Sequence, residues 1–431
     1  MIAKFNSDWY QVALNFRSRI HKLLSMISVD EAIRIVTEQT GSLISERIPL
    51  AQARGCYLAE DVVADSDLPP FDRSQMDGYA VRASDLQTVP ARLKLVGESA
   101  AGRGWHNVMK AGEAVRIMTG APVPTGADSV QQVELTRELG IVNGFAEVEI
   151  IEPVSPGRSI VTRGSEIKGG ETVLRAGEQI TAAAMAVLAS FGYSQINVGK
   201  RPRVAVLATG SELVAIDQKP GQDQIRDSNN FSISAYAELA GANVEMLPLA
   251  GDDTALLKRQ VTEAAERNDV IVTSGGVSVG VYDFTKPALK ELNAEIFFER
   301  VALRPGKPTV FARLPNGALF FGLPGNPVSV SVTFNLFART ALLLMQGATE
   351  TTLAGEWALL ARGVKGAVAR ESYLPARLNT TEEGILTAEP LKWGGSSDFV
   401  GFVRATALII VPQGTGLLET GTKVRVVHLP V

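Results

Sequence analysis

Four segments of the sequence combine glycine with small hydroxyl residues and carboxylates. They occupy positions 208–212, 250–253, 274–280 and 322–327, and each follows a short apolar run. Glycine lets backbone amides approach an anion closely, and a helix that begins after such a loop adds its dipole. Together these loops predict a site for a phosphate or another oxyanion. Neither G-x-G-x-x-G nor the Walker pattern is present, so any one loop taken alone could equally be a tight βα turn.

Three carboxylates lie in these loops: Glu212, Asp252 and Asp253. Acids in βα loops are most often helix caps or first-turn residues. Their number at one sheet edge favours a divalent metal instead. Magnesium takes few protein carboxylates and completes its shell with oxygens of a bound phosphate, so Mg²⁺ suits this composition better than calcium does.

A group of cations follows in the stretch 297–308, which contains Arg300, Arg304 and Lys307. A solvated basic edge is the alternative interpretation. The Pro-Gly and Lys-Pro pairs of this stretch favour a defined turn that aims the cations. Arginine can clamp an oxyanion with two hydrogen bonds, and lysine acts as a point charge.

The segment 69–81, Pro-Pro-Phe-Asp-Arg-Ser-Gln-Met-Asp-Gly-Tyr-Ala-Val, is rich in proline, glycine and polar side chains. Such a composition is unlike a core strand and is typical of an ordered functional loop, with a purely structural turn as the alternative.

Strands and helices alternate from residue 201 onward. This alternation must position the four glycine-rich loops. Strands are predicted at 203–208, 244–249, 270–273 and 318–323, and helices at 230–239, 254–267, 286–292 and 328–345. Helices of this length between strands imply parallel βαβ units in a doubly wound sheet. The loops after the strands then meet at the carboxyl edge of the sheet, where ligands bind.

The rest of the chain predicts a multidomain α/β and β protein. Ser28 caps a helix that ends near Gly41, alternating runs between 91 and 153 indicate β structure, and short strands return after 354. The predicted domains are an N-terminal helical extension (1–26), a linking α+β domain (27–68 with 154–200), an inserted β domain (69–153), the α/β domain (201–346) and a small C-terminal β domain (347–431).

Composition narrows the functional classes. The 431 residues carry a formal charge of −4, which lacks the overall basic field of a protein that binds nucleic acid through its phosphates. A single cysteine, Cys56, cannot form an intrachain disulfide, so a reducing, cytoplasmic setting is expected. The apolar stretches 181–191 and 328–345 are short or interrupted by polar residues, so no membrane span is expected.

Five motifs, in this order along the chain, resemble those of molybdopterin molybdenumtransferases and of the similar C-terminal domain of gephyrin. They are Phe-Asp-Arg-Ser-Gln-Met-Asp-Gly-Tyr-Ala-Val (71–81), Arg-Ile-Met-Thr-Gly-Ala-Pro-Val-Pro (116–124), Ser-Gly-Gly-Val-Ser-Val-Gly (274–280), Pro-Gly-Lys-Pro (305–308) and Gly-Leu-Pro-Gly-Asn-Pro (322–327). The resemblance runs from about residue 27 to the C-terminus.

The resemblance implies an elongated four-domain subunit in an antiparallel homodimer, with each active site between the α/β domain of one subunit and the β domain of the other. It also implies the reaction: molybdate enters the dithiolene of adenylylated molybdopterin with Mg²⁺, and AMP leaves. A molybdopterin adenylyltransferase is the implied partner in the pathway. No nucleic-acid or membrane partner is expected.

Carried over position by position, the resemblance implies roles for individual residues. The catalytic residues would be Asp77, Thr119, Glu212, Asp252 and Asp283, of which Glu212, Asp252 and Asp283 would also bind the metal. The residues that would bind the cofactor are Gly275, Gly276, Ser278, Arg300, Arg304, Lys307, Pro324, Asn326 and Pro327.

The sequence departs from the family pattern at two places. Ser211 stands where the family often has aspartate, which removes one possible metal ligand, and Glu166 lies in Arg-Gly-Ser-Glu where the family has Arg-Gly-Glu-Asp. Three alternatives stay open: a molybdopterin adenylyltransferase, a paralogue specific for tungstate, and a scaffold like gephyrin. The adenylyltransferase signature Thr-Gly-Gly-Thr-Gly is absent, and no peptide groove is evident in the sequence.

Overall fold

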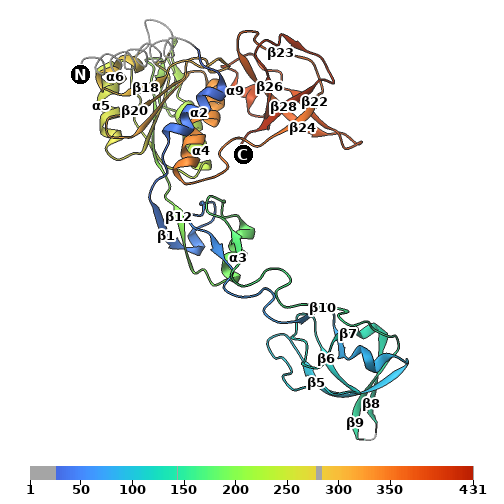
Figure 1. Ribbon diagram of the computed structural model, residues 1–431. Helices are drawn as coiled ribbons and strands as arrows, with labels where there is room; N and C mark the ends of the chain where they lie inside the picture. Colours follow the sequence, from blue (N-terminus) through green and yellow to red (C-terminus); the bar gives the residue numbers. More distant parts are fainter. Residues whose placement is uncertain (1–25, 143, 278–283, 431) are drawn as a thin grey trace, which may run out of the picture. The chain divides into compact units, whose positions relative to one another are not determined.

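The computed structural model describes residues 26–142, 144–277 and 284–430. The chain forms two compact units, shown in Figure 1. One contains the described residues up to Glu60, Ala176–Thr181 and the chain from Gln195 onward, and the other contains Asp61–Arg175 and Ala182–Ser194. The predicted N-terminal extension lies outside the described residues, apart from residue 26.

A six-stranded sheet lies at the centre of the first unit, in the order β16, β13, β17, β21, β20, β18. Its first four strands are parallel, as predicted. The last two strands were not predicted: β20 pairs antiparallel with β21, and β18 pairs antiparallel with β20. The bounds are β13 (Arg203–Ala208), β16 (Asn243–Met246), β17 (Val270–Ser274), β18 (Glu295–Phe298), β20 (Val310–Arg313) and β21 (Leu319–Leu323).

A tight hairpin makes the sheet mixed, because β20 returns directly into β21 through Asn316 and Gly317. Gly317 has a φ of +93°, and the Leu314 N–H donates to the Ala318 carbonyl at 2.9 Å. An Asn-Gly pair between two apolar runs is a strong hairpin signal. It could have identified this edge of the sheet from the sequence.

Helices cover both faces of this sheet, so the predicted doubly wound arrangement is confirmed. Successive residues of β13 point to opposite faces: Val204 packs in the core with α2, α4, α7 and α8, and Ala205 packs in the core with α5 and α6. Figure 1 shows these two helical layers. The bounds are α2 (Val29–Gln39), α4 (Asn229–Leu239), α5 (Thr254–Ala265), α6 (Thr285–Glu291), α7 (Pro327–Thr333) and α8 (Arg339–Met345).

Residues Pro327 to Met345 form one continuous helical stretch. Its middle, Phe334–Ala338, is π-helical. With 19 residues, this stretch is long and apolar enough to cross a membrane by length and composition alone, contrary to the expectation from its sequence. In the structure, 89% of its most apolar stretch of 18 residues is buried. The helix therefore has the burial of a core helix.

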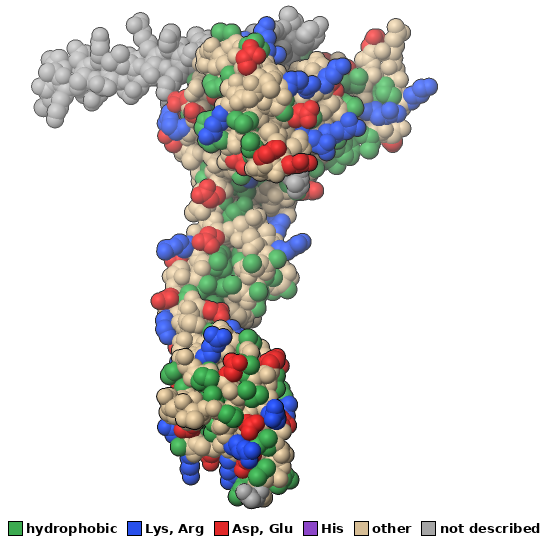
Figure 2. Space-filling model, turned by 90° about the vertical axis from the view of Figure 1, so that its right-hand side faces the viewer, with side chains coloured by type: hydrophobic (Ala, Val, Ile, Leu, Met, Phe, Trp, Pro, Cys, Tyr) green, Lys and Arg blue, Asp and Glu red, His purple; other side chains and the backbone are tan. Residues whose placement is uncertain are grey.

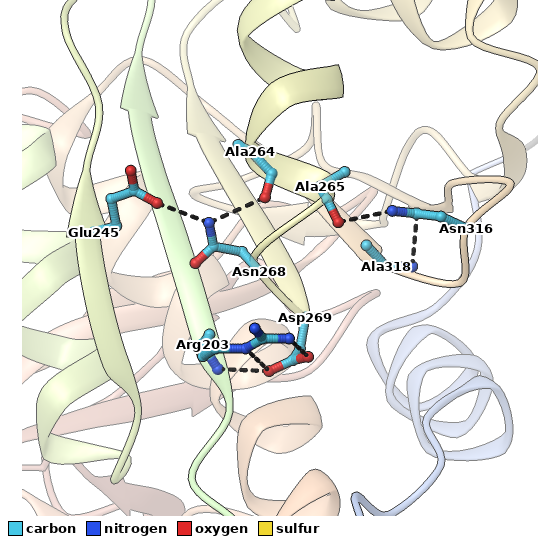
Figure 3. Close-up of polar contacts among 8 residues, drawn as sticks. All are labelled: Arg203, Glu245, Ala264, Ala265, Asn268, Asp269, Asn316 and Ala318. Carbon is cyan, nitrogen blue, oxygen red and sulfur yellow. Dashed lines mark hydrogen bonds and ion pairs between the residues drawn. The ribbon is translucent and has the colours of Figure 1, made fainter.

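Polar contacts join the strands at the amino ends, opposite the loops of interest (Figure 3). Arg203, at the start of β13, forms a bidentate ion pair with Asp269, which precedes β17 (2.9 and 3.2 Å). Asn268 donates to Glu245 of β16 at 2.8 Å, and Asn316 donates to the Ala265 carbonyl at 2.7 Å. These contacts lie at the amino ends of the strands. The four glycine-rich loops lie at the opposite, carboxyl edge of the sheet.

The predicted small C-terminal β domain is present as a second six-stranded sheet. Its order is β19, β24, β25, β22, β28, β26, and β24 also pairs with β26. The bounds are β19 (Leu303–Arg304), β22 (Gly355–Leu360), β24 (Glu371–Thr380), β25 (Leu386–Pro390), β26 (Ala407–Val411), β28 (Lys423–His428) and the short helix α9 (Phe399–Phe402). Two short strands from the same part of the chain, β23 (Val364–Lys365) and β27 (Leu417–Leu418), form a separate antiparallel pair.

The second unit contains the predicted inserted β domain. Its six-stranded sheet has the order β7, β4, β6, β5, β9, β8. The bounds are β4 (Gly78–Val81), β5 (Ala91–Ser99), β6 (Glu113–Ile117), β7 (Ser129–Gln132), β8 (Thr136–Val142) and β9 (Phe145–Ile150). One small pairing, β1 (Ser45–Pro49) with β12 (Gln195–Gly199), belongs to the first unit. In the second unit, β2 (Val62–Val63) pairs with β11 (Thr172–Leu174), and β3 (Arg73–Ser74) pairs with β10 (Ile160–Val161). Helix α3 (Ala182–Ser190) also belongs to this unit.

Candidate active site

A hollow of about 440 Å³ lies at the carboxyl edge of the α/β sheet. The structure brings together there many of the predicted site residues, from four different loops. The lining comprises Thr209, Gly210, Ser211, Glu212, Asp252, Gly275, Gly276, Val277, Pro308, Pro324, Gly325 and Asn326. The loops therefore meet as the strand order requires.

Backbone hydrogen bonds hold these loops against one another. The Thr209 N–H donates to the Ser274 carbonyl at 2.9 Å, and the Gly275 N–H donates to the Leu323 carbonyl at 3.1 Å. The Gly210 N–H donates to the Ala250 carbonyl at 3.1 Å. The backbone hydrogen bonding of the parallel sheet thus continues into the loops that line the hollow.

Glycine is required at the turn after β17. Gly275 and Gly276 have φ values of +89° and +65°, which L-residues with side chains rarely adopt. A Cβ on Gly275 would lie 2.3 Å from the Thr209 carbonyl oxygen. The Gly275 N–H is already bonded to the Leu323 carbonyl, so the Gly276 N–H is the amide of this pair that can approach a bound anion, and no side chain intervenes.

The two neighbouring acids after β16 have different roles. Asp253 caps α5, accepting hydrogen bonds from the amides of Ala255 (2.8 Å) and Leu256 (3.2 Å), so the cap interpretation holds for this acid. Asp252 instead lines the hollow and accepts a 2.6 Å hydrogen bond from the Ser211 hydroxyl. Where the family often has aspartate, this chain therefore supplies a donor that orients Asp252.

The predicted metal ligands are only partly described. Glu212 and Asp252 both line the hollow. Asp283 and Ser278 lie outside the described residues. Within the described part of the chain, no group of three or more His, Cys, Asp or Glu side chains is placed to hold a metal ion.

Buried hydroxyls beneath the Gly-Gly turn were not found from the sequence. The hydroxyl oxygens of Thr273, Ser274 and Thr285 are buried without a hydrogen-bond partner among the described residues. Thr285 begins α6, and its N–H donates to the Gly276 carbonyl at 3.1 Å. Their positions, at the end of β17 and the start of the next helix, are the only sequence signal that points to them.

The three predicted cations lie in a structured turn, but none of them lines the hollow; only Pro308 of this stretch does. The Lys307 carbonyl accepts hydrogen bonds from the amides of Val301 (3.0 Å) and Thr309 (3.1 Å), so the expected defined turn is present. Arg304 belongs to β19. The Nε of Arg300 is buried without a hydrogen-bond partner in the described structure.

Asn326 and Pro327 begin α7, with Pro327 at the first helical position. The Asn326 side chain does not cap the helix but donates to the Ser396 hydroxyl at 2.8 Å. The neighbouring Gly325 carbonyl accepts a 2.7 Å hydrogen bond from the Asn229 side chain. Ser396 and Asn229, which hold this loop from distant segments, could not be found from local sequence.

Asp77 and Thr119 lie together in the second unit. The pairing of β4 with β6 sets Gly78 opposite Ile117, which brings the residues beyond these strand ends within reach. Asp77 Oδ1 accepts hydrogen bonds from the Thr119 backbone amide (2.7 Å) and hydroxyl (3.0 Å). These two bonds, the amide first, lower the pKa of the Asp77 carboxyl, so it is ionised at neutral pH.

The second departure from the family pattern also has a defined place in this unit. Glu166 pairs with Arg73 at 3.1 Å, and both side chains are about half exposed. A surface pair of this kind contributes little stability. The ion pair does join the segment 69–81, through Arg73, to the segment that carries Glu166.

Thr119→Val is expected to raise the pKa of Asp77, while leaving it below the ordinary aspartate value because the amide bond remains. Because the pKa is depressed in the folded state, the stabilisation from this contact is present above the ordinary pKa and is lost as the pH falls through the depressed one. A carbon-13 NMR titration of the carboxyl would measure the shift. Thr119→Ser, which keeps the hydroxyl, is the control. An unchanged pKa in the valine variant would mean that the hydroxyl does not act on Asp77.

Three family models match successive parts of the chain. The MoeA N-terminal region (domain I and II) matches residues 27–192, the probable molybdopterin binding domain matches 205–343, and the MoeA C-terminal region (domain IV) matches 358–429. The hollow described above falls within the second of these. Fold and site thus define a multidomain protein of the MoeA class, built around a molybdopterin-binding α/β domain.

Relatives cover nearly the whole chain. The molybdopterin molybdenumtransferase of Staphylococcus aureus (strain Mu50 / ATCC 700699) is 36% identical over 405 residues, which is 93% of this chain and 95% of that protein. That of Haemophilus influenzae is 34% identical over 403 residues, 93% and 98%. A crystal structure of the molybdopterin biosynthesis MoeA protein from Pyrococcus horikoshii OT3 matches with a TM-score of 0.79 and 26% identity, covering 94% and 100%. The chain belongs to the molybdopterin molybdenumtransferase family, as its motifs indicated.

Proposed function

We propose that this protein inserts molybdate into the dithiolene of adenylylated molybdopterin and releases AMP. The observation that carries the proposal is the hollow at the sheet edge, where the Gly275–Gly276 turn and the carboxylates of Glu212 and Asp252 face one ligand space. The Gly276 amide of this turn suits the substrate's phosphates. The relatives named as molybdopterin molybdenumtransferases support the metal-inserting reaction over other uses of the same fold.

The carboxylates in the hollow fit a magnesium ion. Mg²⁺ is commonly held by one or two carboxylates together with substrate phosphates, and Glu212 and Asp252 supply that number. Bound there, the ion would neutralise phosphate charge as AMP leaves. Ser211 would orient Asp252 toward it through the 2.6 Å hydrogen bond. Asp283 is proposed as a third ligand from the resemblance alone.

The cations of the segment 300–307 are proposed to receive the oxyanions of the reaction. Arg300 supports this role, because its Nε has no hydrogen-bond partner among the described residues and could donate to an oxyanion. Molybdate is a dianion, so Arg304 and Lys307 would add attraction without being specific for its shape.

We also propose that the protein acts as a homodimer in the cytoplasm and receives its substrate from a molybdopterin adenylyltransferase. The dimer follows from the motif resemblance, in which Asp77 and Thr119 act together with the α/β domain of the partner subunit. We propose no nucleic-acid or membrane partner. In Figure 2, side chains of both signs occur on the face drawn.

The alternatives differ in how well they account for the whole chain. An adenylyltransferase needs no MoeA-type regions on either side of its α/β domain, yet this chain matches both. A scaffold role draws no support from the retained acids and cations. A tungstate-specific reaction uses the same residues and is separated from the molybdate reaction only by experiment.

The test is an incubation of the purified protein with adenylylated molybdopterin and Mg²⁺, with molybdate, with tungstate, or with no oxyanion. AMP release that depends on molybdate is the expected result. A preference for tungstate would assign the tungstate reaction, and the absence of AMP release with either oxyanion would refute the proposal.

A further inference from the structure

One ion pair of the α/β unit joins two segments that carry proposed site residues. Lys286 belongs to α6, and Glu299 follows the last residue of β18. Lys286 Nζ and Glu299 Oε2 are 3.6 Å apart, and the two side chains are 12% and 19% exposed. Both charges are therefore largely removed from water, where their attraction is stronger than that of a surface pair. Neutralising one of them would leave the other buried without this partner.

The active-site turn places Lys286. Thr285 is the first residue of α6, and its N–H donates to the Gly276 carbonyl at 3.1 Å. Gly276 lines the active-site hollow. Lys286, the next residue, is therefore one position beyond a direct contact with the lining of the hollow.

The other partner of the pair directly precedes Arg300, the cation proposed to receive an oxyanion. On the far side of Arg300, its carbonyl accepts a hydrogen bond from the Ile27 N–H at 3.3 Å. On the near side, the ion pair with Lys286 holds Glu299. Arg300 is therefore anchored in both directions along the chain. Such anchoring keeps a binding side chain in its geometry before the ligand arrives.

The side chain of Arg300 is available from this anchored position. It is partly exposed, and its Nε has no hydrogen-bond partner among the described residues. A guanidinium group binds an oxyanion well only when its N–H groups point in the right directions. Whatever fixes the backbone at residues 299 and 300 therefore affects how well Arg300 binds an oxyanion.

A second lysine–glutamate pair of the same unit allows a comparison. Lys258 of α5 and Glu291 of α6 are 3.2 Å apart, but their side chains are 40% and 58% exposed, and neither residue lines the active-site hollow. An exposed pair of this kind contributes little to stability. A buried pair also contributes little net stability, because the loss of hydration offsets the attraction. The Lys286–Glu299 pair differs from the exposed one in joining the Gly276 turn to Arg300.

We propose that Lys286 and Glu299 are positioning residues for the oxyanion substrate. Their ion pair holds Arg300 in the orientation that binds molybdate and ties it to the turn at Gly276. The pair acts through the backbone between Glu299 and Arg300 and is not proposed to contact the substrate. This inference rests on the proposed function, in which Arg300 receives the oxyanion.

The direction of the effect of Glu299→Gln separates positioning from a simple effect of charge. Removing a carboxylate next to Arg300 makes the surroundings more positive, so an effect of charge alone would tighten molybdate binding. The loss of positioning would weaken it. Binding of molybdate and of AMP to each full-length variant is measured by calorimetry. The KM for molybdate and kcat come from AMP release, and circular dichroism and thermal melting check the fold.

Glu299→Gln is expected to weaken molybdate binding about fivefold or more and to raise the KM for molybdate, with AMP affinity and kcat nearly unchanged. A merely structural role would lower the melting temperature without this split between KM and kcat. Glu299→Asp keeps the charge and should recover part of the loss. Glu291→Gln breaks the exposed pair and is the matched control, which should leave molybdate binding unchanged.

Unchanged or tighter molybdate binding by folded Glu299→Gln would overturn the inference, and so would an equal loss of AMP affinity. The absence of molybdate binding by the wild type would also overturn it. If Glu299→Gln does not fold, Glu299→Asp carries the same test, with a smaller loss of molybdate affinity expected and wild-type affinity as the contrary result. Because calorimetry involves no turnover, its outcome is independent of the AMP-release assay that tests the proposed function.

Discussion

Replacing Asp252 by alanine is expected to lower the rate of AMP release by about a hundredfold or more, while the protein stays folded. Asp252 lines the ligand space and its carboxylate is oriented by Ser211. Its loss removes negative charge at the place proposed for magnesium and phosphate. Loop acids that face a cavity contribute little to the core, so the melting temperature should change little. Glu212→Ala is expected to behave in the same way.

The adjacent acid provides the matched control. Asp253 caps α5 and does not line the hollow, so Asp253→Ala should cost about 1 kcal/mol of stability and leave the rate nearly unchanged. The two variants thus predict opposite patterns for activity and stability. Equal rates in Asp252→Ala and in the wild type would remove the assignment of this hollow as the active site.

Mixing two inactive variants, Asp77→Ala and Asp252→Ala, is expected to restore activity if the proposed homodimer shares its sites between subunits. A mixed dimer would then hold one site with both lesions and one with neither. Random exchange makes about half of the dimers mixed, so recovery should approach a quarter of the wild-type activity, provided the sites are independent.

The control for this mixing experiment uses two lesions in the same part of the chain. Asp77 and Thr119 are hydrogen-bonded to each other, so Asp77→Ala mixed with Thr119→Ala leaves a lesion in every site. That mixture should stay inactive. If the Asp77→Ala and Asp252→Ala mixture also stays inactive after subunit exchange has been verified, the proposal that two subunits share each site is wrong.

Much of the fold could be predicted from residue patterns, because the α/β unit repeats one simple rule. Apolar runs of strand length separated by helices require parallel strands, and the parallel core from β16 to β21 follows it. The antiparallel edge was not predicted, because β18 and β20 flank the cation-rich stretch 297–308, whose Pro-Gly and Lys-Pro pairs indicate a turn. The Asn316-Gly317 pair is the local sequence signal that indicates a hairpin at this edge.

The site was predictable where glycine and strand ends decide it, and less so where distant segments meet. The convergence of the loops at Gly275 and Gly276 follows from the topology of a parallel sheet. The separate roles of Asp252 and Asp253 could not be predicted, because neighbouring acids differ only in the direction that the folded loop gives them. Ser396 and Asn229 reach the Gly325–Asn326 loop through tertiary packing, for which a single sequence offers no period or spacing.

The proposed function requires that this protein makes an active molybdenum cofactor. The most direct measurement is the activation of a purified, cofactor-free molybdenum enzyme after incubation of this protein with adenylylated molybdopterin, Mg²⁺ and molybdate, with AMP counted in the same samples. AMP release and activation of the acceptor enzyme are expected to rise together, and both should depend on molybdate and on Asp252. AMP release without activation of the acceptor enzyme, or activation that does not need this protein, would contradict it.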